Sequence, residues 1–162
     1  MNERILVQDN NTVTNERLIE LLRAVPVRDL IREAIGAREN SYSPYSEYQV
    51  GAAIYTSDGI IYTGCNIENA SYGATVCAER TAIFKAISEG AKGFRAIAIV
   101  GSPKGRIINQ FAYPCGICRQ VMNEFADARE FIVIVAKSET EYRVFSLDEL
   151  LPQGFGPLNL AE

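Results

Sequence analysis

Three cysteines at the starts of two predicted helices restrict the possible structure and chemistry of this chain more than any other feature. Cys115 and Cys118 are three residues apart on one helix face, so both sulfurs can bind a single metal ion. Pro114 suits the entry to that helix, because no amide hydrogen is needed there. Cys77 supplies a third thiolate from the start of a separate helix, and a helix N-terminus favours thiolate over thiol. The pattern therefore predicts a metal bound by three thiolates.

The chain contains no histidine. Any metal must therefore be held by thiolates and carboxylates, and acid–base chemistry falls to a carboxylate, Lys, Tyr or Cys. Glu79 lies two residues after Cys77 and is the candidate proton carrier. Three protein ligands leave one tetrahedral position open, as in catalytic zinc sites, where zinc lowers the pKa of water to about 7. The combination predicts hydrolysis at an electrophilic carbon, with Zn²⁺ as the cofactor.

Two other interpretations of the cysteines are weaker. With Cys65 as a fourth ligand, the set would form a closed structural site, which has no use for Glu79. A redox pair formed by Cys115 and Cys118 alone would leave Cys77 and Glu79 unexplained.

Two arginines stand close to the cysteine segments. Three thiolates around a divalent cation leave an excess of negative charge, which would weaken its effect on the acidity of water. Arg80 and Arg119 each follow a ligand segment closely. We expect both to donate hydrogen bonds to the sulfurs and so to offset that charge.

Charge and hydropathy limit the partners. The formal net charge is −4 over 162 residues, and the basic residues are not clustered. Nucleic acid is therefore not expected as the main partner. The N-terminus lacks the long apolar run of a secretory signal, and no stretch approaches the roughly twenty apolar residues that span a bilayer. We expect a cytoplasmic protein without membrane contact.

The chain is predicted to form one catalytic domain, 28–162, after an N-terminal extension, 1–27. Helical spacing and alternation give the element order α-β-β-α-β-α-β-α. The expected helices cover 28–38, 76–89, 115–125 and 146–151, and the expected strands cover 48–55, 60–64, 95–101 and 131–137. A tight turn is expected at 57–59. This order favours an α/β fold with three α/β/α layers, in which helices flank one mixed sheet.

Six segments together resemble the small homotetrameric class of zinc-dependent cytidine deaminases. Two of them carry the cysteines, Cys77-Ala78-Glu79-Arg80-Thr81 and Pro114-Cys115-Gly116-Ile117-Cys118-Arg119-Gln120. The other four are Ser43-Pro44-Tyr45-Ser46, Tyr48-Gln49-Val50-Gly51-Ala52, Gly64-Cys65-Asn66-Ile67-Glu68-Asn69 and Leu151-Pro152-Gln153-Gly154-Phe155-Gly156-Pro157. The likeness runs from about Arg28 to Leu160. It implies the deaminase fold and deamination of cytidine and 2′-deoxycytidine to the uridines, in pyrimidine salvage.

The resemblance implies roles for the residues at the metal. Cys77, Cys115 and Cys118 would bind Zn²⁺, and Glu79 would carry the protons. Arg80 would hydrogen-bond the thiolates.

The resemblance also implies a set of substrate contacts. Asn66 and Glu68 would hydrogen-bond the ribose hydroxyls, and the backbone N–H of Ala78 would orient the pyrimidine. Tyr48 stands where the family usually has Phe stacked on the base. Tyr72 and Phe155 resemble residues that enter the site from a neighbouring subunit, which implies a homotetramer with shared active sites.

Several alternatives remain open at this point. The substrate that the resemblance implies is cytidine or 2′-deoxycytidine, and a related cytosine nucleoside such as a blasticidin-type antibiotic is the second possibility. A zinc-stabilised binding module is the contrasting class without catalysis. Phe155 would equally serve as a core aromatic residue, and Glu68 as a solvated loop carboxylate.

Overall fold

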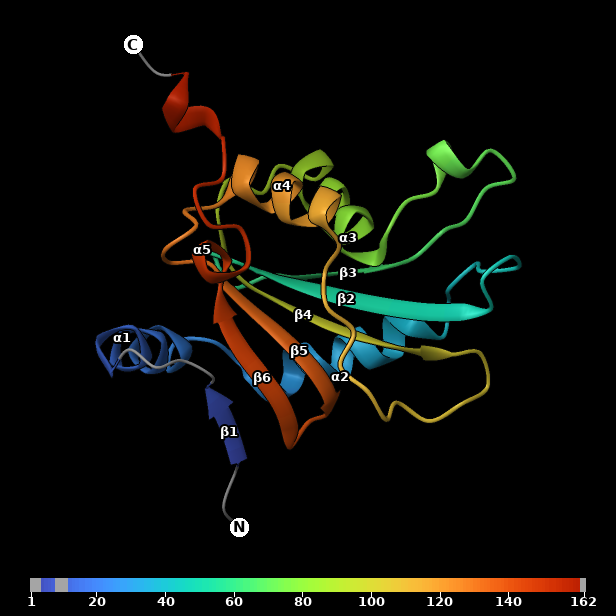
Figure 1. The fold of residues 1–162 in the computed structure, drawn as a ribbon, viewed down its shortest axis with the longest axis horizontal. Helices are drawn as coiled ribbons and strands as arrows, with labels where there is room; N and C mark the ends of the chain where they lie inside the picture. Colours follow the sequence, from blue (N-terminus) through green and yellow to red (C-terminus); the bar gives the residue numbers. More distant parts are fainter. Residues whose placement is uncertain (1–3, 8–11, 161–162) are drawn as a thin grey trace.

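The computed structural model describes residues 4–7 and 12–160, which form one mixed sheet with helices on both faces (Figure 1). The strands follow the order β1-β6-β5-β4-β2-β3. The neighbouring pairs β1/β6 and β4/β5 are parallel, and the other three pairs are antiparallel. The strands are β1 (Arg4–Val7), β2 (Tyr48–Thr56), β3 (Ile61–Cys65), β4 (Phe94–Pro103), β5 (Ile132–Ser138) and β6 (Glu141–Ser146).

Two hydrophobic cores lie on opposite faces of the sheet, because alternate residues of a strand point to opposite sides. Helix α2 (Val27–Arg38) contributes Leu30 and Ile31 to one core. Helices α3 (Ala78–Ser88) and α4 (Gly116–Phe125) cover the other face, where Ile83 and Met122 are buried (Figure 1). The three-layer α/β/α fold with one mixed sheet is therefore confirmed.

The remaining short elements lie at the edges of these layers. Helix α1 (Thr12–Leu22) precedes α2, and α5 (Leu147–Leu150) follows β6 directly. Two single-turn 3₁₀ helices, η1 (Tyr72–Ala74) and η2 (Pro157–Asn159), lie in the loop before α3 and in the tail. No helix within the described ranges has the length and apolar character needed to cross a membrane.

Two strands were not predicted. β6 pairs antiparallel with β5, and Tyr142 and Val144 on it are buried, so the alternation in 141–146 is a true strand pattern. β1 then pairs in parallel with β6. The expected turn at 57–59 is present, and Gly59 there has a φ of 89°, which favours glycine.

The division at residue 27 stays a prediction. Residues 1–3 and 8–11 of the proposed extension, and 161–162 of the proposed domain, lie outside the described residues. Leu22 and Val25, from the proposed extension, are buried in the same core as Leu30.

Candidate active site

The three predicted cysteine ligands come together at the N-termini of α3 and α4. Cys77 is the residue before the first turn of α3, and Cys115 holds the same position on α4. Cys118 lies in the first turn of α4 and is fully buried. The sulfur atoms of Cys77 and Cys115 are 3.9 Å apart, and those of Cys115 and Cys118 are 3.5 Å apart. All three sulfurs lie within 4.8 Å of one another.

These sulfur separations fit a zinc ion. A Zn–S bond of about 2.3 Å in tetrahedral geometry places two ligand sulfurs about 3.8 Å apart. The two measured separations are 3.9 and 3.5 Å. Three thiolates also match the ligand preference of zinc and leave one position for a fourth ligand. The donor set therefore suits a catalytic zinc site.

A close approach between β3 and α3 sets the position of Cys77. Gly64 on β3 lies so near the first turn of α3 that a Cβ atom there would be 2.6 Å from the carbonyl oxygen of Ala78. Only a residue without a side chain permits this approach. The glycine thus determines how far from the sheet α3 begins.

Hydrogen bonds among the thiols shift their pKa values in opposite directions. The bond with Cys118, helped by donors from Arg80 and Cys115, lowers the pKa of Cys77 to about 5. The same bond with Cys77, together with burial, raises the pKa of Cys118. A divalent cation favours the deprotonated form of every thiol that binds it.

Of the two arginines that were expected to donate hydrogen bonds to the sulfurs, one does so in the structure. Arg80 donates from Nη2 to the Cys77 sulfur at 3.7 Å and to the carbonyl oxygen of Thr75 at 3.0 Å. Arg119 turns away from the sulfurs, so the expectation for it was wrong. Its guanidinium donates to the carbonyl oxygens of Pro114, at 2.9 Å, and Leu150, at 2.7 Å.

Glu79 is a buried carboxyl group in the first turn of α3. Only 4 % of its surface is exposed. Burial raises the pKa of Glu79 to about 7, because a charged carboxylate is poorly solvated there. The negative charge of Cys77 acts in the same direction, and a hydrogen bond with Cys118 acts against it. A carboxyl group in such surroundings accepts and releases a proton readily near neutral pH.

Cys65 is not part of the cluster. It ends β3, is partly exposed, and donates to the carbonyl oxygen of Asn40 at 3.3 Å. Within the described residues, Cys77, Cys115 and Cys118 are the one group of three or more candidate ligands. The geometry gives no support to the closed four-cysteine site.

Asn66 and Glu68 hold the loops beside the cluster. The Asn66 side-chain oxygen accepts from Ser41 Oγ at 2.5 Å and from the Val50 N–H at 2.8 Å. The Asn66 amide nitrogen donates to the carbonyl oxygen of Tyr48 at 2.8 Å, and its second N–H has no partner among the described residues. The role of Ser41 was not predicted, because an isolated serine carries no sequence signal.

The Glu68 carboxylate accepts from the N–H groups of Tyr45, at 2.8 Å, and Ser46, at 3.2 Å. Hydrogen bonding from Ser46 and these backbone groups lowers the pKa of Glu68, so the group is ionised. A cavity of about 380 Å³ lies beside it, lined by Tyr45, Ser46, Glu68, Tyr72 and Thr75. Glu68 and Tyr72 therefore face the same space.

Tyr48 points to the same side of the sheet as the metal cluster. It shares the alternation of Val50 and Ala52, which pack in the core under α3 and α4. The hydroxyl group of Tyr48 accepts a hydrogen bond from Gln110 Nε2 at 3.2 Å. This bond identifies the partner of the hydroxyl group that distinguishes tyrosine from phenylalanine here.

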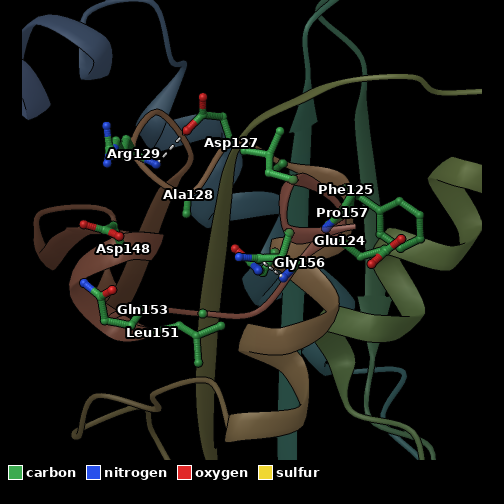
Figure 2. Close-up of a pocket in the computed structure, with 15 residues that line it drawn as sticks. Glu124, Phe125, Asp127, Ala128, Arg129, Asp148, Leu151, Gln153, Gly156 and Pro157 are labelled. Atoms are coloured by element: carbon green, nitrogen blue, oxygen red, sulfur yellow. Dashed lines mark hydrogen bonds between the residues drawn. The ribbon is translucent and has the colours of Figure 1, made fainter. Parts of the chain in front are cut away.

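Phe155 lies on the tail and is 61 % exposed. Its carbonyl oxygen accepts from Gln120 Nε2 at 2.8 Å and from Asn123 Nδ2 at 3.0 Å, so α4 fixes the backbone that carries the ring. A cavity of about 660 Å³ lies next to this tail (Figure 2), lined by residues of 123–129, Asp148 and residues of 151–159. Gly154 and Gly156 line it but Phe155 does not. This cavity contains none of the cysteines and is separate from the metal cluster.

The comparison with known families decides how this arrangement is classified. Residues 26–135 match the family described as "Cytidine and deoxycytidylate deaminase zinc-binding region". The chain belongs to this deaminase family. The matched region contains all three cysteines and Glu79. Zinc is therefore the metal that the three-cysteine cluster binds.

Individual deaminases of the family are similar over most of the chain. A cytidine deaminase of Halalkalibacterium halodurans is 49 % identical over 126 residues, which cover 78 % of this chain and 91 % of that protein. One from Sporosarcina psychrophila is 43 % identical and covers 83 % and 95 %. The crystal structure of cytidine deaminase from Burkholderia pseudomallei has a TM-score of 0.71 and 45 % identity, and covers 78 % and 97 %.

Proposed function

We propose that this deaminase hydrolyses cytidine and 2′-deoxycytidine to uridine and 2′-deoxyuridine, with release of ammonia. The observation that carries the proposal is the buried carboxyl group of Glu79 beside the three-cysteine cluster. The names of the similar proteins, which are cytidine deaminases, support the same substrate class.

Glu79 is proposed as the proton carrier of the reaction. Cys77, Cys115 and Cys118 would hold a zinc ion, which would lower the pKa of the attacking water. The carboxylate of Glu79 would take one proton from the attacking water and give it to N3 of the pyrimidine, as the water oxygen bonds to C4. The same carboxyl group then moves the remaining proton of that oxygen to the 4-amino nitrogen. The C4–N4 bond breaks, ammonia leaves, and uridine keeps its proton on N3.

The nucleoside would be held by the groups around Tyr48. The second N–H of Asn66 and the ionised carboxylate of Glu68 suit the ribose hydroxyls, one as donor and the other as acceptor. The backbone N–H of Ala78 lies in the first turn of α3, where amide groups have no partner within the helix. It suits an oxygen or nitrogen of the pyrimidine, and the ring of Tyr48 suits its face.

The active sites are proposed to be shared within a homotetramer. Phe155 and Tyr72 are 61 % and 74 % exposed in the isolated chain, although both are large apolar side chains. The hydrogen bonds from Gln120 and Asn123 to the Phe155 carbonyl oxygen fix the backbone that carries this exposed ring, which supports a contribution to a neighbour's site. The proposed setting is cytoplasmic pyrimidine salvage.

A substrate panel tests the proposed reaction. The zinc-loaded protein is incubated with cytidine, 2′-deoxycytidine or free cytosine, and ultraviolet absorbance and ammonia are followed together. We expect ammonia in equal amount to uridine from cytidine and to 2′-deoxyuridine from 2′-deoxycytidine, and far less reaction with cytosine, which lacks the sugar. Failure to release ammonia from either nucleoside would contradict the proposal.

A mixing experiment tests the shared sites. Subunits with Glu79→Gln alone are combined with subunits with Phe155→Ala alone, under conditions that exchange chains. Mixed tetramers then contain sites with both native residues, so activity should exceed the mean of the parents. A monomer in sedimentation, or mixtures without recovery despite exchange, would contradict the sharing.

A further inference from the structure

The segment between β4 and α4 ends at Cys115, the most exposed of the three candidate metal ligands. Residues 104–115 contain no helix or strand and end at Cys115. In Figure 1 this connection extends beyond the end of β4 and turns back towards the start of α4. Cys115 is exposed, whereas Cys118 is buried and Cys77 is half-buried.

The other two ligands are fixed by regular structure. Cys118 lies within α4 and packs in the core under it. Cys77 is tied to β3 by the close approach at Gly64 and to Arg80 by a hydrogen bond. Cys115, like Cys77, precedes the first turn of its helix, and Arg119 holds the Pro114 carbonyl group beside it. Its placement depends further on what holds the rest of the irregular segment before it.

Arg143 on β6 holds that segment at two points. Its Nη1 donates to the hydroxyl oxygen of Tyr113 at 2.6 Å, and its guanidinium carbon lies 4.4 Å from the centre of the Phe111 ring. Tyr113 also packs edge-on against Phe145, with ring centres 5.9 Å apart. Arg143 pairs in register with Val135 on β5. A short charge-assisted hydrogen bond and a cation over an aromatic face are both directional contacts.

Among the described residues, the Arg143 guanidinium contacts Tyr113 and Phe111 of this segment. Lys137 also lies over the Phe111 ring, at 4.5 Å, but it pairs with Glu141 at 2.7 Å. Within the described residues, Arg143 forms no ion pair with a carboxylate. Its buried Nε has no hydrogen-bond partner in the part of the chain that the structure describes, so holding the side chain here costs desolvation free energy.

We propose that Arg143 is a positioning residue for the zinc site. By fixing Tyr113 and Phe111 against the sheet, it holds Cys115 at bonding distance from the metal and slows the release of zinc. Arg143 does not touch the metal cluster and acts through the segment that leads to it. The inference rests on the zinc site alone and does not depend on the substrate.

The rate of zinc release tests this role. Zinc-loaded Arg143→Met and Tyr113→Phe proteins are mixed with excess chromogenic chelator, and the transfer of zinc is timed. We expect release about 10-fold faster for each, in the range known for residues that orient metal ligands. Because both changes break the same hydrogen bond, the double variant should release zinc no faster than Arg143→Met. Arg143→Lys should recover part of the loss.

Arg32→Met is the matched control. Arg32 forms ion pairs with Asp29 and with Glu139, which lies in the β5–β6 turn, so this change disturbs the same hairpin away from the segment. It should leave the release rate unchanged.

If both test variants release zinc at the wild-type rate, the proposal is overturned, even if their melting temperatures fall. Arg143 would then stabilise the fold without positioning the metal ligand. The proposal would also be overturned if the increases in the rate of zinc release from the two single variants multiplied in the double variant. If Arg143→Met does not fold, Tyr113→Phe decides the question, since it removes a single oxygen atom.

Discussion

Replacing Gly64 with alanine tests the link between the sheet and the metal site. The added Cβ would lie 2.6 Å from the carbonyl oxygen of Ala78 and 2.9 Å from the carbonyl carbon of Thr81. The backbone nitrogen of Ala82 would lie closer still, and an ordinary contact needs about 3.4 Å, so the start of α3 must move by about 1 Å. Ligand distances in metal sites tolerate about 0.2 Å. The shift therefore carries Cys77 out of bonding range unless the site distorts.

We expect Gly64→Ala to lower zinc affinity by at least about 10-fold and to destabilise the fold by about 1–3 kcal/mol, as overpacked positions do. Affinity is measured by titration in zinc buffers, and stability by denaturant unfolding. Gly36→Ala in α2 is the control, because nothing lies within 4 Å of its added Cβ. It should keep full affinity and gain up to about 1 kcal/mol from helix propensity. Native zinc affinity in Gly64→Ala would refute the reasoning.

Three further substitutions probe individual contacts. Cys65→Ser should keep one zinc per chain by elemental analysis, because Cys65 lies outside the cluster; loss of zinc would revive a four-cysteine site. Arg80→Gln should release zinc about 10-fold faster, because it loses the bond to the Cys77 sulfur; an unchanged rate would remove Arg80 from the charge balance. Tyr48→Phe should raise KM for cytidine by about 2- to 3-fold at constant kcat, because one exposed hydrogen bond from Gln110 is lost; a change in kcat instead would contradict this.

The layers were predictable because strong local patterns agree with the tertiary structure. Leu30, Ile31 and Ala34 recur at helical spacing in 28–38 and are all buried. β6 was not predicted because it spans only six residues, Glu141–Ser146, and Phe145 breaks the alternation of apolar and polar residues after Val144. Such a short strand depends on pairing with β5, a long-range contact that a local pattern does not reveal.

The metal ligands were predictable for a different reason. The spacing of Cys115 and Cys118 is a local property of one helix turn, and the residue types restrict the metal. The partners of Arg119 were not predictable, because Pro114 and Leu150 are brought to it only by the fold. The same holds for Arg143, whose contact with Tyr113 joins residues far apart in the sequence.

The central claim is that Glu79 moves the protons of a zinc-dependent deamination. The most direct measurement is the kcat of fully zinc-loaded Glu79→Gln with cytidine. The amide keeps the shape of the side chain but cannot accept a proton from water, and general acid–base catalysis is typically worth about 10²–10⁴-fold. Because one carboxyl group serves several transfers, we expect a loss at or above the upper end of this range. A variant that retains zinc and more than about a tenth of wild-type kcat would contradict the account.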